Sequence, residues 1–219
     1  MERQRDLAEL LRDPGRMYGD ESVFREECEG LFAHNWIFAG LATDIPASND
    51  FFRVPMFNRD VVVQNFHGEP HAFINSCSHR HSQIQHEIRG NRPLVCPYHG
   101  WAYDKRGVPT GIPRREEFPE VCANPEAYRL HSVDLERAGN FLFLRLGGDG
   151  ADLREFLGEA HGFLESVSEG MDRSLDEVEA SVGANWKLVI ENSLEGYHVP
   201  LVHRNSLAAI AQLTGAKLK

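Results

Sequence analysis

The sequence predicts an α+β protein in which N-terminal helices precede a small antiparallel all-β domain and the first part of a second, α+β domain. Apolar residues recur at helical spacing near the N-terminus, short β-branched and aromatic segments dominate the middle, and a helical pattern returns towards the C-terminus. A glycine-rich stretch, "LGGDG" at 146–150, is the best linker candidate. The expected divisions are an N-terminal helical segment at 1–35, the all-β domain at 36–146 and the partial second domain at 151–219.

Length and charge limit the classes of function. The 219 residues have room for one large domain or two small ones, and 42% of them are hydrophobic. Asp plus Glu number 33 against 23 Lys plus Arg, so a formal net charge of -10 would repel a polyanion such as DNA or RNA. The sequence has no signal-peptide pattern, no apolar run of about 18 residues and no disulfide framework. We therefore expect a soluble, cytoplasmic protein that binds neither nucleic acid nor membrane.

Each group of elements has its own signal. Phe24, Cys28 and Leu31 form one apolar stripe of an N-terminal helix. Asn185 is a suitable N-cap before Trp186 and predicts the start of a long helix. The segments expected as strands are "FFRVPMF", "DVVVQNF", "HAFIN", "WAYD" and "NFLFLRL". Such short strands, bounded by turn residues, are typical of a small sandwich or barrel-like domain.

The stretch "CSHRHSQIQHEIRGNRPLVCPYHGW" carries two mixed ligand pairs, Cys77-x-His79 and Cys96-x-x-His99, with 16 residues between them. Each pair can be presented by one loop tip, so two facing loops would form a four-ligand cage. Iron–sulfur clusters usually take four thiolates, and two imidazoles in place of two of them raise the reduction potential. Structural zinc also takes two Cys and two His, usually as Cys-Cys and His-His pairs. The third interpretation is scattered loop histidines and core cysteines; the mixed pairs between turn residues favour a [2Fe–2S] site.

The motif "CSHR…CPYHGW" resembles the cluster signature of Rieske non-haem iron oxygenases, the family of ring-hydroxylating dioxygenase large subunits and related mono-oxygenases. The resemblance implies a Rieske [2Fe–2S] domain in which Cys77 and Cys96 bind one iron and His79 and His99 bind the other. Many members have Gly where this chain has His81, a departure that concerns the conformation of the loop.

Three side chains near these pairs carry further expectations. His81 is expected to face solvent or to support a ligand. Trp101 and Tyr98 are expected to shield the centre from water, which also tunes its potential.

The second constellation is "NWKLVIENSLEGYHVPLVH" at 185–203. On the expected helix, Glu195 and His198 lie three residues apart and would project side by side, as two ligands of one metal do. Pro200 would bend the chain and bring His203 back towards them. Two imidazoles and a carboxylate form the facial triad that leaves positions open on Fe(II). The alternative is a polar helix face turned to solvent.

This stretch is similar to the family's catalytic motif, within a helix-grip-like domain. The resemblance implies that His198 and His203 bind a mononuclear Fe(II), and that Glu195 links this iron to the Rieske histidine of a neighbouring subunit. The form with Glu is closest to choline-, carnitine- and betaine-type oxygenases. The family's third iron ligand is a carboxylate further on, whereas the residues after His203 include no Asp or Glu. We therefore expect a C-terminally truncated chain, a second polypeptide or an unbuilt iron site; Glu191 or Glu195 as third ligand is the weaker alternative.

The activity implied by the resemblance is O2-dependent mono- or dioxygenation of a small aromatic or quaternary-amine substrate. Electrons would come from NAD(P)H through a separate reductase or ferredoxin, pass to the [2Fe–2S] cluster, and reach the iron by way of a Rieske histidine and Glu195. Family members form trimers, so a homotrimer is expected. The alternatives are a Rieske-ferredoxin-like electron carrier and an inactive fragment.

Overall fold

The structure is a computed structural model, and it describes residues 14–57, 59–148, 150–171 and 180–207. The helix expected before residue 14 lies outside this range. The chain divides into two compact units, Glu26–Glu177 and a second unit made of Met1–Arg25 with Val178–Lys219.

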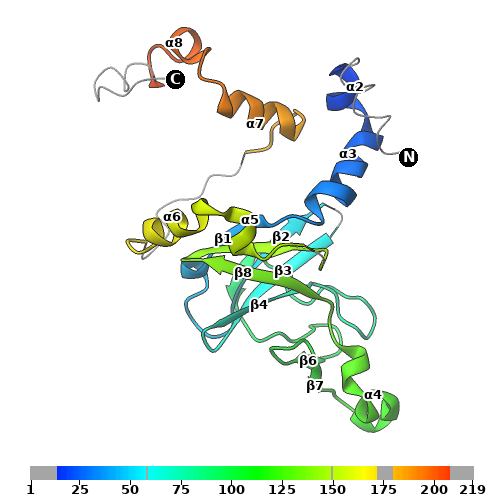
Figure 1. The fold of residues 1–219 in the computed structure, drawn as a ribbon. Helices are drawn as coiled ribbons and strands as arrows, with labels where there is room; N and C mark the ends of the chain where they lie inside the picture. Colours follow the sequence, from blue (N-terminus) through cyan, green and yellow to red (C-terminus); the bar gives the residue numbers. More distant parts are fainter. Residues whose placement is uncertain (1–13, 58, 149, 172–179, 208–219) are drawn as a thin grey trace. The chain divides into compact units, whose positions relative to one another are not determined.

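The larger unit is built on one antiparallel sheet with the order β1-β9-β8-β4-β3-β2-β5 (Figure 1). A second, two-stranded sheet pairs β6 with β7. The strands are β1 (Ile37–Leu41), β2 (Asp50–Met56), β3 (Arg59–Phe66), β4 (Glu69–Ile74), β5 (Arg89–Asn91), β6 (Ala102–Tyr103), β7 (Pro109–Gly111), β8 (Ser132–Ala138) and β9 (Phe141–Arg145). The expected α+β class and its antiparallel all-β domain are confirmed.

Strand β3 shows why the sheet is buried on both faces. Successive side chains of a strand point to opposite faces. Val62 packs on one face with Phe51 and Phe73, in the cluster that includes the two candidate cysteines. Val61 and Val63 pack on the other face, in a separate apolar cluster. The run "VVV" thus packs into two apolar cores at once. This packing gives a rigid support to the face that holds the candidate cysteines.

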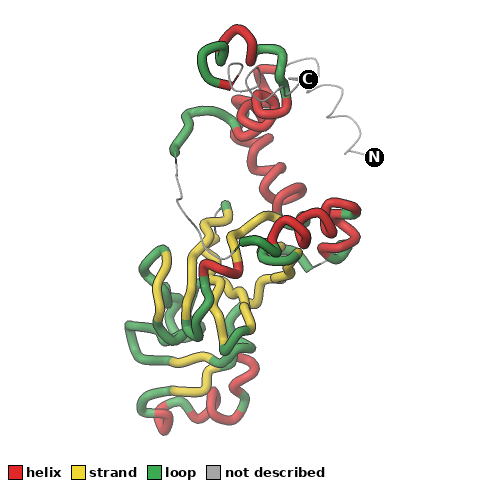
Figure 2. The backbone as a smooth tube through the Cα atoms, turned by 90° about the vertical axis from the view of Figure 1, so that its left-hand side faces the viewer, coloured by secondary structure: helices red, strands yellow, loops and turns green. Residues whose placement is uncertain are grey.

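The helices of this unit lie at its two ends. In Figures 1 and 2, α4 (Pro119–Ala123) and the small sheet lie at one end, away from α5 (Leu153–Leu157) and α6 (Glu159–Ser168). Asp152 caps α5 by accepting the N–H of Glu155 at 2.8 Å, and the fully buried Leu153 packs against Trp36. The packing thus groups α5 and α6 with the sheet; the divisions 1–35, 36–146 and 151–219 stay a prediction.

The smaller unit holds α2 (Pro14–Gly19), the start of α3 (Glu21–Glu27), α7 (Trp186–Leu194) and α8 (Val199–Val202). The predicted N-cap is confirmed, because the Asn185 side chain accepts the N–H of Lys187 at 3.0 Å. Tyr18 of α2 donates its hydroxyl to the Glu191 carboxylate at 2.9 Å, which ties the N-terminal segment to α7. Among the described residues, every helix is too short or too polar to cross a bilayer.

Candidate metal centres

Two loops with the same backbone pattern carry the first candidate ligands. We call them the first cluster loop (76–85) and the second cluster loop (92–101). In each, the cysteine carbonyl accepts the N–H of the residue four positions on: His81 to Cys77 at 2.8 Å, and Gly100 to Cys96 at 2.9 Å. The cysteine N–H in turn donates to the carbonyl five positions on, at 2.8 Å in both loops. The sequence thus folds into two equivalent tips that face each other.

The sulfur side of these tips is closed and the imidazole side is more open. Cys77 and Cys96 are 2% and 1% exposed, within the apolar cluster of the larger unit. The rings of His79 and His99 lie at the loop tips with centroids 4.6 Å apart. His79 is half-buried and His99 is exposed. The four predicted ligands are therefore brought to one place, from two loops.

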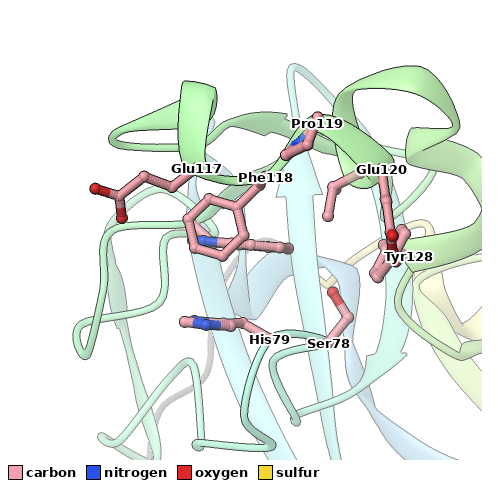
Figure 3. A pocket seen from close by; sticks show the side chains of 9 residues that line it. Ser78, His79, Glu117, Phe118, Pro119, Glu120 and Tyr128 are labelled. Atoms are coloured by element: carbon pink, nitrogen blue, oxygen red, sulfur yellow. The ribbon is translucent and has the colours of Figure 1, made fainter.

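Aromatic side chains enclose His79 more than His99. The Trp101 indole stacks on the His79 ring at 4.9 Å. The Phe118 ring meets the His79 ring edge-on at 5.5 Å (Figure 3). Trp101 is buried, as expected of a shield. Tyr98 contacts the His99 ring at 4.0 Å but is 61% exposed, so its expected shielding role is confined to one ring face.

Beside His79 the surface opens into a cavity of about 390 Å³. Figure 3 shows the His79 and Phe118 side chains along one side of it and Tyr128 on the other. The residues that line it are Ser78, His79, Trp101, Glu117, Phe118, Pro119, Glu120, Val121 and Tyr128. The imidazole side of the site is thus accessible, in contrast to its cysteines.

The donor set fits a two-iron cluster better than a single ion. The Nδ1 atom of His79 is buried without a hydrogen-bond partner, an arrangement that a bound metal would satisfy. Among the described residues no three His, Cys, Asp or Glu side chains are grouped to hold one metal ion. Structural zinc takes four ligands on one ion, whereas a Rieske cluster takes only two protein ligands on each iron.

Burial sets the protonation of these ligands. It raises the pKa of the Cys77 thiol, although the Tyr103 hydroxyl opposes this shift. Burial also lowers the pKa of His79, as do the nearby charges of His99 and Arg80. The metal-free site therefore holds a neutral imidazole and a thiol, and metal binding would release a thiol proton.

Tyr103 is a candidate residue of this site that the sequence analysis missed. Its hydroxyl lies 3.0 Å from Cys77 Sγ and accepts the N–H of Ser78 at 3.2 Å. Burial raises the pKa of Tyr103, so the phenol stays protonated and can donate to the sulfur. The available signal was alternation on a strand, since Tyr103 follows Trp101 by two residues and therefore shares its face.

A Tyr103→Phe substitution is expected to lower the reduction potential of the bound cluster. A hydrogen bond to the sulfur stabilises the more negative, reduced state, and the phenylalanine cannot make it. A loss of about 1 kcal/mol corresponds to a shift of roughly 40 mV for one electron. A redox titration followed by visible absorbance measures it. Tyr128→Phe, in the cavity wall, is the matched control; an unshifted potential in Tyr103→Phe would contradict the assignment.

His81 adopts the conformation that glycine favours at its position. Its φ is 56°, and the equivalent residue of the second cluster loop is Gly100 with φ 74°. The loop therefore keeps the shared geometry despite the departure from the family motif, with strain at His81. His81 is exposed, as predicted.

A His81→Gly substitution is expected to stabilise the protein by about 0.5–1 kcal/mol. The left-handed conformation costs a non-glycine residue about 1–2 kcal/mol, and the entropy of glycine in the unfolded chain offsets part of that gain. Urea denaturation measures the difference. Gly100→Ala is the reciprocal variant: it should destabilise, since its Cβ would also lie 3.1 Å from Pro113. A change of the unfolding free energy in the same direction for both variants would be inconsistent with this account.

The second candidate centre lies at the junction of α7 and α8. Glu195 Oε2 lies 2.6 Å from His198 Nδ1, and Glu195 Oε1 accepts the N–H of His198 at 3.0 Å. The rings of His198 and His203 lie 5.4 Å apart. The hydrogen bond from His198 holds the pKa of Glu195 below its ordinary value, so the carboxylate is ionised at neutral pH. The three predicted residues are therefore close together.

The backbone that carries these side chains differs from the prediction. The expectation of one helix carrying Glu195 and His198 is wrong: α7 ends at Leu194, and Glu195 is extended. His198 instead caps a separate short helix, and Pro200 lies in the first turn of that helix, where its missing N–H costs nothing. The turn before His198, and not a proline bend after it, brings the side chains together.

Glu191 is occupied elsewhere in the smaller unit. Both of its carboxylate oxygens accept from the Tyr18 hydroxyl, at 2.9 and 3.0 Å. Within the described part of the chain, His198 and His203 have no third ligand grouped with them. The structure thus gives no support to Glu191 as the third ligand.

Two family models match the chain. Residues 35–125 match the Rieske [2Fe-2S] domain, and residues 164–216 match the ring hydroxylating alpha subunit (catalytic domain). The first match covers both cluster loops, and the second covers α7 and α8.

Known proteins show the same relationship. The glycine betaine monooxygenase oxygenase subunit of Chromohalobacter salexigens is 34% identical over 97% of this chain and 47% of its own length. The toluate 1,2-dioxygenase subunit alpha of Pseudomonas putida is 31% identical over 93% of this chain and 47% of its own length. The structure of a naphthalene 1,2-dioxygenase with indole bound is 30% identical, with a TM-score of 0.74 over 92% of this chain and 48% of that one.

This chain therefore spans about half the length of the relatives it matches. Membership of their family implies a [2Fe–2S] cluster for the Rieske domain and mononuclear iron for the catalytic domain. Both family matches, the relatives and the shared fold agree: this chain belongs to the Rieske non-haem iron oxygenases, with a Rieske domain followed by part of a ring-hydroxylating catalytic domain.

Proposed function

We propose that the chain is part of the oxygenase component of a Rieske-type enzyme, which carries out O2-dependent mono- or dioxygenation of a small organic substrate. The observation that carries this proposal is the convergence of two Cys/His loops on a buried, unpaired His79 Nδ1, in a chain that also brings two histidines and a carboxylate together further on. Glycine betaine monooxygenase and toluate dioxygenase subunits are its relatives, so the substrate class is a quaternary amine or an aromatic compound.

The proposed ligands divide between the two centres. Cys77 and Cys96 would hold one iron of the cluster, and His79 and His99 the other. When bound, the cluster supplies one-electron transfer and the mononuclear iron supplies the oxygen chemistry. The protein closes the thiol side to water, keeps His79 neutral and packs its ring against both Trp101 and Phe118.

His198 and His203 are the proposed ligands of the mononuclear iron. The Glu195 carboxylate holds the proton on His198 Nδ1 and so leaves the Nε2 lone pair free for the metal. We also propose that Glu195 links this centre to the Rieske histidine of a neighbouring subunit in a homotrimer, and that a separate NAD(P)H-dependent reductase or ferredoxin supplies electrons.

Iron analysis of the purified chain tests this assignment. An oxygenase chain binds three irons, two in the cluster and one at His198 and His203. A Rieske-ferredoxin-like carrier, which is the second candidate, binds two. A His198→Ala, His203→Ala double variant should lose one iron and keep the cluster; unchanged iron would contradict the oxygenase assignment.

A further inference from the structure

Two buried glutamines lie at the base of the cluster loops. Gln64 is on β3, on the same face as Val62, and Gln85 ends the first cluster loop. Both side chains are fully buried at 0% exposure. The surrounding cluster is apolar, including Phe51 and Ile84, so the two amides are out of place unless they have a specific role.

The two amides join three segments of the chain. Gln85 Nε2 donates to Gln64 Oε1 at 3.0 Å and to the carbonyls of Arg92 and Pro93, at 3.3 Å each. Gln64 Nε2 donates to the same Arg92 carbonyl at 2.9 Å. The pair thus ties the end of the first cluster loop and the start of the second cluster loop to strand β3. We call this pair the glutamine bridge.

The backbone around Gln85 is held independently of the bridge. Asn75 Oδ1 accepts the N–H groups of Ile84 and Gln85 at 3.1 and 2.9 Å, and Asn75 Nδ2 donates to the Gln85 carbonyl at 2.8 Å. These bonds close the first cluster loop on itself. They make no contact with the second cluster loop. The connection across is made by the Gln85 side chain and by the Arg92 guanidinium, which donates to the Ile84 carbonyl at 3.3 Å.

The glutamine bridge is poorly suited to stabilising the folded state. Gln85 Oε1 is buried without a partner, and an unsatisfied buried acceptor costs about 1–3 kcal/mol. Buried polar groups that are directional favour one arrangement of the surrounding segments over others. The hydrogen bonds of the Gln64 and Gln85 side-chain amides form only when the two cluster loops lie at one particular distance from each other.

We propose that Gln64 and Gln85 are positioning residues that fix the spacing between the Cys77–His79 pair and the Cys96–His99 pair. The inference rests on the cluster ligation proposed above. A spacing that is set in advance holds the ligands where the cluster needs them, so loss of the bridge lets the loops move apart and exposes the cluster to water.

Gln64→Met and Gln85→Met, singly and together, test the bridge in the cluster-loaded chain. Methionine keeps the length and volume of the side chain and removes the amide. The rate of cluster loss to an iron chelator, followed anaerobically by visible absorbance, should rise about tenfold in each single variant, as expected for one lost buried hydrogen bond. The double variant should accelerate cluster loss by less than the product of the two single effects, because both single variants break the Gln64–Gln85 hydrogen bond. The EPR lines of the reduced cluster should broaden.

Asn65→Leu is the matched control. Asn65 is buried on the same strand but on the opposite face, where it donates to the Ile45 carbonyl at 2.7 Å. It should lower the free energy of unfolding and leave the cluster-loss rate unchanged.

Three outcomes separate the proposals. Equal acceleration by Asn65→Leu and Gln85→Met, or an additive double variant, would overturn the bridge. Unchanged loss rates in both single methionine variants would also overturn it; if Gln85→Met does not fold, Gln64→Met decides. A folded wild-type chain that takes up no cluster would instead contradict the proposed ligation.

Discussion

Replacement of Cys77 or Cys96 by serine is expected to abolish the [2Fe–2S] cluster. Both thiols are almost completely buried at the base of facing loops, so no solvent ligand can replace them. Serine keeps the size of the side chain but is a poor ligand for iron at neutral pH, because its hydroxyl remains protonated. Iron and acid-labile sulfide should fall to background, and the visible absorbance of the chain should disappear.

Cys28→Ser and Cys122→Ser are the controls, since they make the same chemical change elsewhere in the chain. Both cysteines are half-buried, and the Cys122 thiol donates to the backbone carbonyl of Arg115 at 3.5 Å. These variants should keep full sulfide content. Loss of the cluster in the controls, or its retention in the Cys77 variant, would refute the ligand assignment.

Replacement of Glu195 by glutamine is expected to lower turnover about 10- to 100-fold while iron binding persists. The carboxylate accepts from both the backbone N–H and the ring Nδ1 of His198. A glutamine has one accepting oxygen, so its NH2 group would face a second donor. The imidazole would then lose the partner that fixes its tautomer. The assay supplies Fe(II), a reductase, NADH and a panel of quaternary amines and aromatics, with iron content measured on the same samples.

Glu191→Gln makes the same change one helical turn earlier. The Tyr18 hydroxyl can still donate to the amide oxygen, so this variant should keep wild-type turnover. Because the pKa of Glu195 is depressed, wild-type turnover should fall only as the pH drops through that low value, and Glu195→Gln should lack this acidic limb. Equal turnover in the two variants would eliminate the proposed role of Glu195.

The two ligand pairs of the first candidate centre could be located from the sequence because their signal is local. Each ligand pair spans only a few residues between turn formers, and strands β2, β3, β4, β6 and β9 lie in segments that are rich in β-branched or aromatic residues. Strand β8 was not predicted, because Asp134, Glu136 and Arg137 interrupt its apolar pattern.

At the second candidate centre the predicted residues lie close together, but the predicted backbone is wrong. Helical periodicity continues through Tyr197, but α7 ends at Leu194 and the backbone is already extended at Glu195. The Tyr197 side chain does not pack against the described part of the chain either, since it is 89% exposed. The side chains of Glu195 and His198 are nevertheless close together, because the two residues are close in sequence and a turn brings such neighbours together as a helix does.

The supporting contacts could not be predicted at all. Tyr103 lies 26 residues from Cys77 and Gln64 lies 21 residues from Gln85, and these pairings exist only once strands and loops are in register. A lone glutamine in an apolar strand has no sequence signal for a partner. Such contacts are a property of the packed fold, which is why they emerge only from the structure.

The most direct test of the account is EPR spectroscopy of the anaerobically purified and reduced chain, combined with iron and sulfide analysis. The account predicts a reduced [2Fe–2S] signal characteristic of mixed cysteine and histidine ligation, with acid-labile sulfide, and the loss of both in Cys77→Ser. A folded, colourless chain that holds zinc between Cys77, His79, Cys96 and His99 would contradict it.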